Sequence, residues 1–386
     1  MKEMKVKAIK GNGTAKKAGE KILLYGLLLL LLAFGLIALF SRKTFSDAER
    51  RNLASRPDAP KAESLLGGKD WHYDSETETF LSDHMPFRRL LTGIANSTEA
   101  ILGQGVWLEC RPIDGAVIEP PVQNADTMLT SLTRLRRFAE SAGKESLFIV
   151  PPTAGSLLEE GGKWYADYGT EREALKELYK EADVIPLFDL FKESAEPVLY
   201  KTDHHWTLHG AYLAYAAFCE RAGLTPVPLG GFTLTEYAPF YGTTLSRSGL
   251  LRYTSDTLCC AEPEYPVTYR IYGEDGAFSE YDHLIFPERA GTYDGYAVYM
   301  DGNHGHTEIL SSAPGAKGTL LVCGDSFSLS LLPFLTAHYE RIVMCDARYA
   351  NLQTVAETAP EAETLLFIYS ADDLCNDTSV KRIRFR

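Results

Sequence analysis

The stretch of sequence that decides the fold is T-L-L-V-C-G-D-S-F-S-L-S-L-L-P-F-L, residues 319–335. Its first five residues, Thr319–Cys323, form a short apolar run that predicts a buried strand. After the turn G-D-S, the apolar segment from Phe327 to Ala337 predicts a helix. A buried strand that leads through a tight turn into a helix is the building unit of α/β proteins.

Similar short apolar runs lie on both sides of this stretch. The further predicted strands are Leu147–Val150, Val184–Leu187, Arg341–Cys345 and Thr364–Tyr369. Short, continuous apolar strands that alternate with helices favour a parallel sheet covered by helices on both faces. The sequence therefore predicts an α/β fold with one such sheet, completed by the units on either side of residues 225–312.

Residues 225–312 differ in composition and predict an insertion of strands and loops. They hold ten of the 21 tyrosines of the chain, at positions 237, 241, 253, 265, 269, 272, 281, 293, 296 and 299. Aromatic rings on this insertion have two interpretations. They stack on sugar rings of a substrate, or they fill a small β-rich layer.

The charge of the chain is unevenly distributed. The whole chain of 386 residues has 39 basic and 52 acidic residues and a net charge of -13. Residues 1–40 carry a net charge of +5, and the remaining residues carry -18. An acidic chain is a poor candidate for a nucleic-acid partner, because binding to phosphates needs surplus Lys and Arg.

The segment Ile22–Phe40 contains nineteen residues without a charge. It is long enough to cross a hydrocarbon core of roughly 30 Å as a helix. Because the lysines precede it, the positive-inside rule places the N-terminus in the cytoplasm and the rest of the chain outside. A cleaved signal peptide and a buried core helix are the alternatives, but no clear A-x-A cleavage site follows the apolar run.

These observations divide the chain into four parts. They are a basic cytoplasmic tail (1–21), a transmembrane anchor (22–40), a stalk (41–70) and an extracellular domain (71–386) with its insertion at about 225–312. The seven cysteines are too few and too irregularly spaced for a disulfide scaffold. Cys323 and Cys345 lie in apolar runs and are expected in the core.

Ser326, in the turn G-D-S, is a candidate nucleophile. It follows a predicted parallel strand, and open α/β sheets place their sites at the carboxyl ends of such strands. It also precedes a helix, whose free backbone N–H groups and dipole favour the oxyanion that forms in acyl transfer. The alternative is that Ser326 only caps its helix.

The segment T-D-H-H-W-T, residues 202–207, offers the base and the acid that a serine nucleophile needs. In an extended stretch, residues two apart point the same way, so Asp203 and His205 are expected to share a face. His204 is then expected to point elsewhere and to be structural, and His209 is a weaker candidate base. A zinc site or a buried polar network is the alternative. No metal is expected, because adjacent histidines on opposite faces cannot easily reach one ion.

Three further positions are candidates for binding the oxyanion or the substrate. Asn303, flanked by glycines in D-G-N-H-G-H, can present its amide as a donor, although it is equally suited to a turn. Arg348 follows the predicted strand that ends at Cys345 and can bind an anion or a carbonyl group. Gly324 is the first residue of the turn that carries the candidate nucleophile.

Together these segments resemble the DHHW protein family of bacterial cell-surface proteins, from about Phe45 to the end of the chain. This family is in turn similar to the alginate O-acetylation proteins, which share a D-x-H-W motif followed by a late serine. The motifs that carry the resemblance are F-S-D-A-E-R-R-N-L-A (45–54), D-H-M-P-F-R (83–88), Y-K-T-D-H-H-W-T (200–207), H-G-A-Y (209–212), F-Y-G-T-T (240–244), D-G-N-H (301–304), G-D-S-F-S (324–328) and D-A-R-Y (346–349).

The resemblance implies an SGNH-hydrolase-like three-layer sandwich in which the catalytic Asp and His precede the Ser. It implies that Ser326 is the nucleophile, His205 the general base and Asp203 the acid that orients it. The implied reaction is the transfer of an acetyl group, through an acetyl-serine, to a hydroxyl of a cell-surface or secreted polysaccharide. No cofactor is implied, because a polytopic membrane acyltransferase is the expected partner that delivers the acetyl group.

Two alternatives to this function are left open. The first is a carbohydrate esterase with the same triad, because the Gly before Asp325 is closer to ordinary SGNH esterases than to the residue that is usual in the family. The second is a non-catalytic module for cell-wall assembly or binding. The acidic outer domain favours a neutral or weakly charged glycan as the acceptor.

Overall fold

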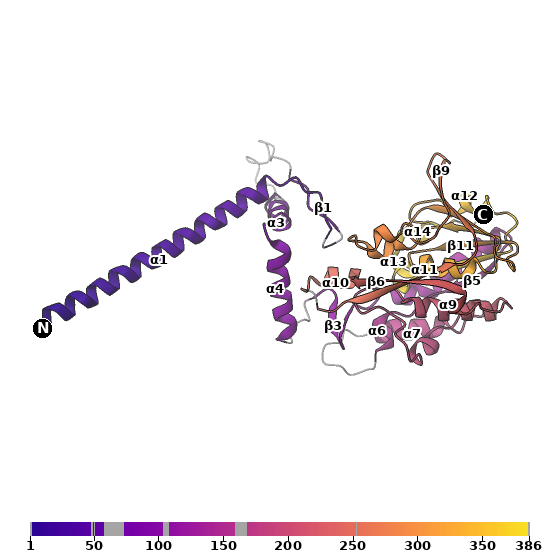
Figure 1. Ribbon diagram of the computed structural model, residues 1–386, viewed down its shortest axis with the longest axis horizontal. Coiled ribbons are helices and arrows are strands. Elements are labelled where there is room, and N and C mark those ends of the chain that lie inside the picture. Colours follow the sequence, from indigo (N-terminus) through magenta and orange to yellow (C-terminus); the bar gives the residue numbers. More distant parts are fainter. Residues whose placement is uncertain are drawn as a thin grey trace. The chain divides into compact units, whose positions relative to one another are not determined.

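The computed structural model describes residues 2–47, 49, 51–57, 73–102, 108–158, 168–251 and 253–384 (Figure 1). The chain divides into two compact units, Met1–Ala95 and Asn96–Arg386. Helix α4 (Arg88–Ile101) begins in the first unit and ends in the second.

The first unit begins with the long helix α1 (Lys2–Leu39). Its part Lys17–Leu39 comprises 23 residues with a mean hydropathy of 2.8. By length and composition, this part fits a single-pass membrane anchor or a signal sequence. The apolar helix predicted at residues 22–40 is therefore confirmed, and the helix also extends through the basic tail.

The remainder of the first unit is held together by ion pairs. Strand β1 (Phe45–Ser46) pairs with β2 (Arg51–Asn52), and α3 spans Tyr73–Asp83. The guanidinium of Arg51 donates to Asp83 at 2.6 and 2.9 Å. These hydrogen bonds are the main cause that lowers the pKa of Asp83 to about 2. Residues 58–70 of the predicted stalk lie outside the described residues.

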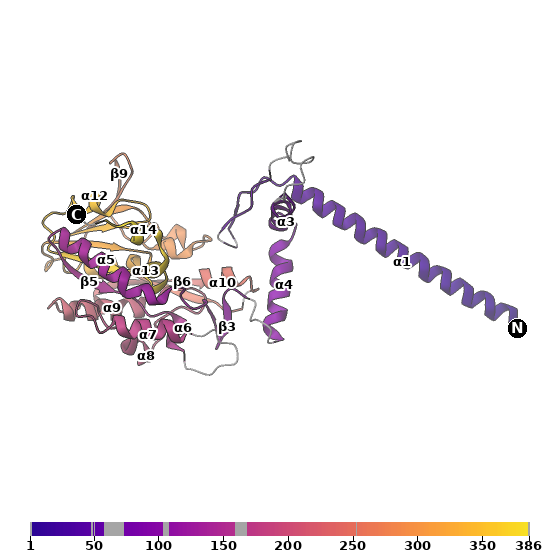
Figure 2. The same ribbon diagram turned by 180° about the vertical axis from the view of Figure 1, so that it is seen from behind.

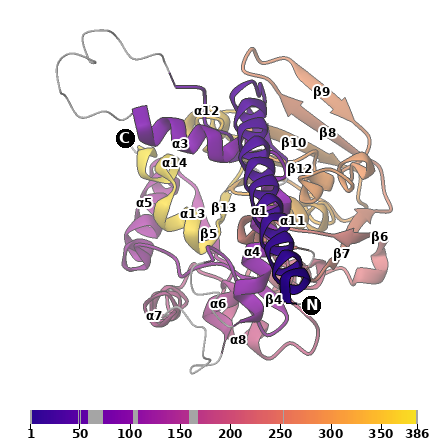
Figure 3. The same cartoon turned by 90° about the vertical axis from the view of Figure 1, so that its left-hand side faces the viewer.

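The second unit is built on a sheet of seven strands in the order β5-β13-β11-β12-β10-β8-β9. The first four are parallel to one another, whereas β10, β8 and β9 extend the sheet by antiparallel pairs (Figure 3). The strands are β5 (Glu145–Ile149), β8 (Val267–Tyr272), β9 (Phe278–Tyr281), β10 (His306–Ser311), β11 (Thr319–Gly324), β12 (Arg341–Cys345) and β13 (Thr364–Ile368). The α/β class and its parallel sheet are confirmed, and three strands of the tyrosine-rich segment join that sheet.

Alternate residues of the buried strands face two hydrophobic cores, one on each side of the sheet. In β11, Leu320 and Val322 belong to one core, and Leu321 and Cys323 belong to the other. Strands that are buried on both faces read as continuous apolar runs, which explains the pattern of residues 319–323.

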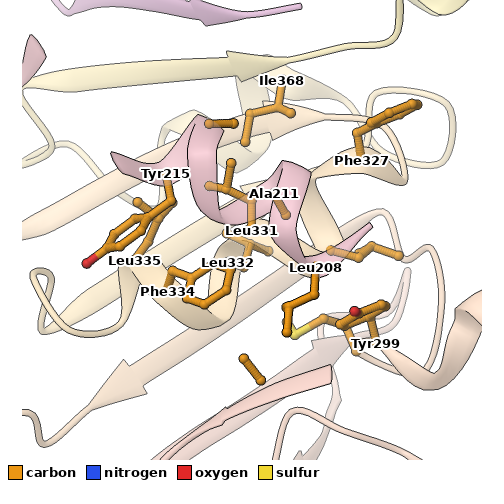
Figure 4. Packing of buried hydrophobic residues seen from close by; sticks show 14 of the residues in the cluster. Leu208, Ala211, Tyr215, Tyr299, Phe327, Leu331, Leu332, Phe334, Leu335 and Ile368 are labelled. Atoms are coloured by element: carbon orange, nitrogen blue, oxygen red, sulfur yellow. The ribbon is translucent and has the colours of Figure 1, made fainter. Parts of the chain in front are cut away.

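Helices from distant parts of the chain cover the two faces. Helices α9 (Leu208–Arg221) and α11 (Phe327–Leu335) pack on the first face, where Leu208, Tyr215, Leu331 and Phe334 interdigitate (Figure 4). The helices of the second face, visible from behind in Figure 2, are α5 (Met128–Ser141), α7 (Gly169–Leu178), α12 (Leu352–Ala356), α13 (Ala371–Asn376) and α14 (Thr378–Arg382). The unit is therefore a three-layer sandwich.

The tyrosine-rich segment also forms a hairpin of β6 (Phe232–Phe240) and β7 (Asp256–Pro263), with α10 (Thr243–Ser248) between them in the chain. Tyr269, Tyr296 and Tyr299 are buried, whereas Tyr253 and Tyr293 are 45% and 51% exposed. The three buried rings therefore belong to the core, and the other two rings lie at the surface.

Short elements complete the second unit. They are β3 (Arg111–Ile113), β4 (Ala116–Ile118), α6 (Ala154–Leu157), α8 (Phe188–Lys192), η2 (Ala125–Thr127), η3 (Leu229–Gly231), η4 (Pro287–Arg289) and η5 (Gly295–Val298). The strand predicted at Val184–Leu187 is reduced to one bridge between Val184 and Phe148. All seven cysteines are unpaired, and Cys323 and Cys345 lie in the core as predicted.

Candidate active site

The candidate site lies at the carboxyl edge of the parallel strands. Ser326 follows β11, and Arg348 follows the neighbouring β12. Because β10 is antiparallel to β12 and starts at this edge, Asn303 lies here too. The topology thus gathers three candidate residues from three neighbouring strands at the place where open α/β sheets bind ligands.

His205 connects the hydroxyl of Ser326 to a carboxylate. Its Nε2 lies 2.7 Å from Ser326 Oγ, and its Nδ1 lies 2.5 Å from Asp203 Oδ1. The side chains of His205 and Asp203 are 5% and 0% exposed, so the base and the acid are shielded from water, whereas Ser326 is half-buried. The structure therefore brings the three residues Asp203, His205 and Ser326 together in the order acid, imidazole and hydroxyl.

The segment that carries Asp203 and His205 is a tight loop and not the extended stretch expected from the sequence. Leu199 and Trp206 form an antiparallel bridge, and the N–H of Tyr200 donates to the carbonyl of His205 at 3.2 Å. The backbone N–H of His205 also donates to Asp203 Oδ1 at 3.1 Å. The predicted pairing of Asp203 with His205 is present, but it arises in this bent loop, so the argument from strand alternation was wrong.

The hydroxyl of Ser326 contacts the imidazole of His205 and does not cap the helix that follows. Ser326 precedes α11 at the N-cap position, but its side chain makes no capping bond. The N–H groups of Phe327 and Ser328 donate to the side chain and the carbonyl of Asp325, at 2.9 and 3.1 Å. Among the described residues, the N–H of Ser326 has no acceptor, so it is available to an oxyanion.

Asp203 is held as a carboxylate by its surroundings. Its Oδ2 accepts a hydrogen bond from the backbone N–H of Thr243 at 2.7 Å. Burial alone would raise the pKa of the Asp203 carboxyl, but His205, His204 and this hydrogen bond lower it well below its usual value. An ionised acid in this position can stabilise a protonated imidazole.

Gly242 allows this approach between the acid and α10. A Cβ atom at position 242 would overlap the Cβ of Asp203. The N–H of Gly242 also donates to the hydroxyl of Thr202 at 3.1 Å, and Asp256 accepts from the N–H of Thr202 at 2.8 Å. The start of α10 is therefore tied to the loop that carries the acid.

Aromatic rings fix the plane of the His205 imidazole. Tyr296 lies parallel to it, with 3.7 Å between the ring centroids and 3° between the planes, and Phe327 lies 4.9 Å away. The hydroxyl of Tyr296 donates to Ser330 Oγ at 2.9 Å, and the indole N–H of Trp206 donates to the same oxygen at 2.6 Å. Ser330 stands one turn after Ser326 on α11, so one helix carries both the nucleophile and the anchor of these rings.

Asp325 fastens the nucleophile turn to the neighbouring strand. Besides Phe327, it accepts a hydrogen bond from the N–H of Ser370 at 2.6 Å. Burial raises the pKa of its carboxyl, in spite of this hydrogen bond. Burial and the nearby Asp325 also raise the pKa of Asp373 to about 8.

Arg348 is occupied by two acidic side chains. It donates to the two oxygens of Asp346 at 3.0 and 2.7 Å and to Asp373 at 3.1 Å. It also lies 3.4 Å from Asn303 Oδ1. Because the amide oxygen of Asn303 faces Arg348, its Nδ2 points away from the guanidinium, and this nitrogen has no acceptor among the described residues. Arg348 therefore positions Asn303, and Asn303 is the better candidate donor.

Gly324 lies inside β11 and is buried. A Cβ atom there would overlap the carbonyl oxygen of Ile368 in β13. A glycine is thus required here for the close approach of β11 and β13 at the start of the nucleophile turn.

His209, the weaker candidate base, and the predicted alternative of a metal site can both be compared with the structure. The Nε2 of His209 lies 3.1 Å from Ser194 Oγ, outside the chain of hydrogen bonds around Ser326. Asp203, His204 and His205 have ligand atoms within 4.8 Å of one another, as a metal site requires. A metal ion bound there would have to replace the hydrogen bonds of His205 with Asp203 or with Ser326.

Sequence reasoning did not identify several residues that shape the site. Gly242 and Thr243 belong to the motif F-Y-G-T-T, but nothing in that motif indicates their contact with Asp203. Tyr296 is one of ten tyrosines in its segment and carries no local signal that singles it out. Ser330 lies in the segment predicted as an apolar helix, and nothing around it in the sequence indicates a role in the site.

Comparisons with known proteins agree with this architecture. A DHHW family protein from Eubacterium siraeum has a similar structure, with a TM-score of 0.59 and 22% identity over 71% of this chain and 94% of that chain. PatB1 from Bacillus cereus, solved with a sulfonyl adduct, has a TM-score of 0.56 and 19% identity over 70% of this chain and 97% of that chain. At these identities, the likeness shows the fold.

A looser match is the O-acetyltransferase domain of Pseudomonas putida AlgJ, with 14% identity over 68% of this chain and 91% of that chain. Its TM-score of 0.41 is too low to support an argument. No curated protein matches this sequence. The family model described as DHHW protein matches residues 170–345, a range that includes Asp203, His205 and Ser326. The resemblance of this chain to the DHHW protein family, predicted from its motifs, is thereby confirmed.

Proposed function

We propose that this protein is an O-acyltransferase that moves an acetyl group to a hydroxyl of a cell-surface or secreted polysaccharide. One observation carries the proposal: His205 bridges Asp203 and Ser326, at 2.5 and 2.7 Å, at the carboxyl edge of a parallel sheet. This arrangement matches what acyl transfer through a serine requires.

In the proposed first step, Ser326 Oγ attacks the carbonyl carbon of an acetyl ester, and His205 Nε2 takes the hydroxyl proton. Asp203 stabilises the imidazolium that forms. In this proposal the N–H of Ser326 and the amide of Asn303 donate to the oxyanion. The C–O bond of the donor then breaks, and His205 returns the proton to the departing oxygen.

In the proposed second step, a sugar hydroxyl attacks the acetyl-serine. Its proton passes to His205 Nε2, the new ester bond forms, and the bond between Ser326 Oγ and the acetyl carbon breaks. His205 then returns the proton to Ser326. No cofactor enters either step.

The proposed location follows from α1. If Lys17–Leu39 spans the membrane with the lysines in the cytoplasm, the second unit lies outside the cell. An acetyl donor would then come from a polytopic membrane acyltransferase, which the resemblance implies as the partner. The anchor would keep Ser326 on the side of the membrane where the glycan is.

An esterase is the second candidate, because the sequence G-D-S resembles that of ordinary SGNH esterases. Water and a sugar hydroxyl compete for the same acetyl-serine. Deletion of the gene separates the two functions: O-acetylation of the surface glycan falls for a transferase and rises for an esterase.

The direct test uses the full chain in detergent. A fluorophosphonate should label Ser326, and Ser326→Ala should abolish both the labelling and the restoration of glycan acetylation in cells that lack the gene. Normal acetylation with Ser326→Ala would reject the proposal. Absence of labelling in the unaltered protein would favour a non-catalytic module.

A further inference from the structure

His204 lies beside the base and is not required to complete the chain of hydrogen bonds. Its ring centroid is 3.9 Å from that of His205, with 35° between the planes, and 6.0 Å from that of Phe327. Its side chain is 27% exposed, whereas that of His205 is 5% exposed. His204 therefore lies between the buried base and the solvent, and does not point elsewhere as the sequence suggested.

The two ring nitrogens of His204 have different environments. Nδ1 is buried without a hydrogen-bond partner in the described part of the chain, and it lies 3.8 Å from Asp203 Oδ1. Nε2 also has no partner there, but this nitrogen is accessible to solvent on a side chain that is 27% exposed. One nitrogen of a neutral imidazole carries the proton, and the other is an acceptor.

The neighbouring carboxylate decides which nitrogen of His204 is the acceptor. Asp203 is held ionised, so a proton on the nearby Nδ1 is favoured electrostatically. Nε2 then presents its lone pair to the solvent next to the base. An exposed acceptor in this place suits a hydroxyl donor.

We propose that His204 Nε2 accepts a hydrogen bond from a second hydroxyl of the acceptor sugar, next to the hydroxyl that His205 deprotonates. The proposal rests on the proposed transferase function and names the class of acceptor, a glycan with neighbouring free hydroxyl groups. Two imidazoles with centroids 3.9 Å apart are close enough to contact adjacent oxygens of one sugar ring.

A hydrogen bond from the sugar to His204 would affect the second step, the attack of the sugar hydroxyl on the acetyl-serine. A sugar that is held by His204 keeps its attacking oxygen against the acetyl-serine, whereas water has no second hydroxyl to offer. The attacking hydroxyl loses its proton to His205, bonds to the acetyl carbon and displaces Ser326 Oγ, which recovers that proton. His204 itself exchanges no proton and is a substrate-binding residue.

The test compares three full-length variants in cells that lack the chromosomal copy. His204→Phe keeps a ring against His205 but removes both nitrogens, and His204→Gln restores an acceptor oxygen. His209→Phe is the matched control, since His209 contacts Ser194 outside the site. O-acetyl content of the native surface glycan should fall about fivefold in His204→Phe, the effect of one neutral hydrogen bond. It should recover largely in His204→Gln and stay unchanged in His209→Phe.

A second measurement separates acceptor binding from formation of the acyl-enzyme. Purified full-length protein is given 4-nitrophenyl acetate, with methyl glucoside or its 3-deoxy analogue as acceptor. In His204→Phe, the ratio of acetyl transferred to methyl glucoside to acetyl transferred to water should fall. The decrease should be about as large as the one that the unaltered protein shows when the deoxy analogue replaces methyl glucoside.

Unchanged glycan acetylation in His204→Phe would overturn the inference, and so would an equal loss of nitrophenol release and transfer in that variant. Transfer to neither acceptor by the unaltered protein would also overturn it. Failure of the proposed function is a separate result, because it would appear as acetylation that persists in Ser326→Ala.

Discussion

The phenol ring of Tyr296 lies face to face with the imidazole of His205, at 3.7 Å between the centroids and 3° between the planes. Tyr296 comes from the tyrosine-rich segment, and His205 from the loop before α9. The phenol hydroxyl is held by Ser330 at 2.9 Å, so neither ring can tilt without breaking a buried hydrogen bond. This stack limits the base to the one orientation that reaches both Asp203 and Ser326.

Tyr296→Leu should therefore lower kcat for 4-nitrophenyl acetate. A parallel aromatic pair contributes about 1 kcal/mol beyond its buried area, so the expected loss is about fivefold to tenfold. Tyr296→Phe keeps the ring and should lose much less. If both variants lose activity equally, the hydroxyl and not the stack would be the important part of Tyr296.

Gly242→Ala should inactivate the protein without unfolding it. The added Cβ would displace Asp203, and misplacement of the acid leaves the imidazole without its orienting partner. The expected loss in kcat is about 100-fold. Gly230→Ala is the control, because nothing lies within 4 Å of a Cβ at that position. Circular dichroism and thermal unfolding of both variants check the fold, and full activity of Gly242→Ala would contradict the close approach.

The pH dependence of kcat should show an alkaline limb that belongs to Asp373. Its pKa is raised to about 8, first by burial and then by Asp325, so it keeps its proton at neutral pH. As the pH rises through about 8, Asp373 becomes negative close to the nucleophile turn and disfavours the oxyanion. Activity should therefore decline above this pH in the unaltered protein and decline less in Asp373→Asn. A limb of the same position and depth in Asp373→Asn would assign it to another group.

Arg348→Met should lower the free energy of unfolding more than the loss of an exposed ion pair does. Asp346 has a side chain that is only 2% exposed, and without Arg348 it would be a buried charge without a counter-ion. The expected loss is about 3 kcal/mol. Arg289→Met breaks the pair of an arginine that is 45% exposed and should lose about 1 kcal/mol or less. Chemical denaturation of both variants measures the difference. Equal losses in the free energy of unfolding would show that the ion pairs of Arg348 contribute no more than an exposed pair.

The sequence was informative where the chemistry is local. Thr319–Cys323 and the turn after it predicted a strand, a helix and a serine at the sheet edge, because apolar runs and turn residues act over a few positions. Asp203 and His205 were chosen correctly as neighbours of that serine, although for a wrong geometric reason.

The parts that could not be predicted depend on contacts between distant residues. Nothing in the sequence near Tyr296 distinguishes it from other tyrosines, because its role is set by His205, 91 positions earlier in the chain. The placement of β10 beside β12 is likewise a long-range pairing, so the tyrosine-rich segment was expected as a separate insertion and not as part of the main sheet.

The position of β13 has a consequence for the biosynthesis of this chain. Residues 364–368 lie between β5 and β11, and in the described part of the chain β5 pairs with no other strand of the sheet. The four parallel strands that carry Ser326 at their edge therefore cannot assemble until residues 364–368 have left the ribosome.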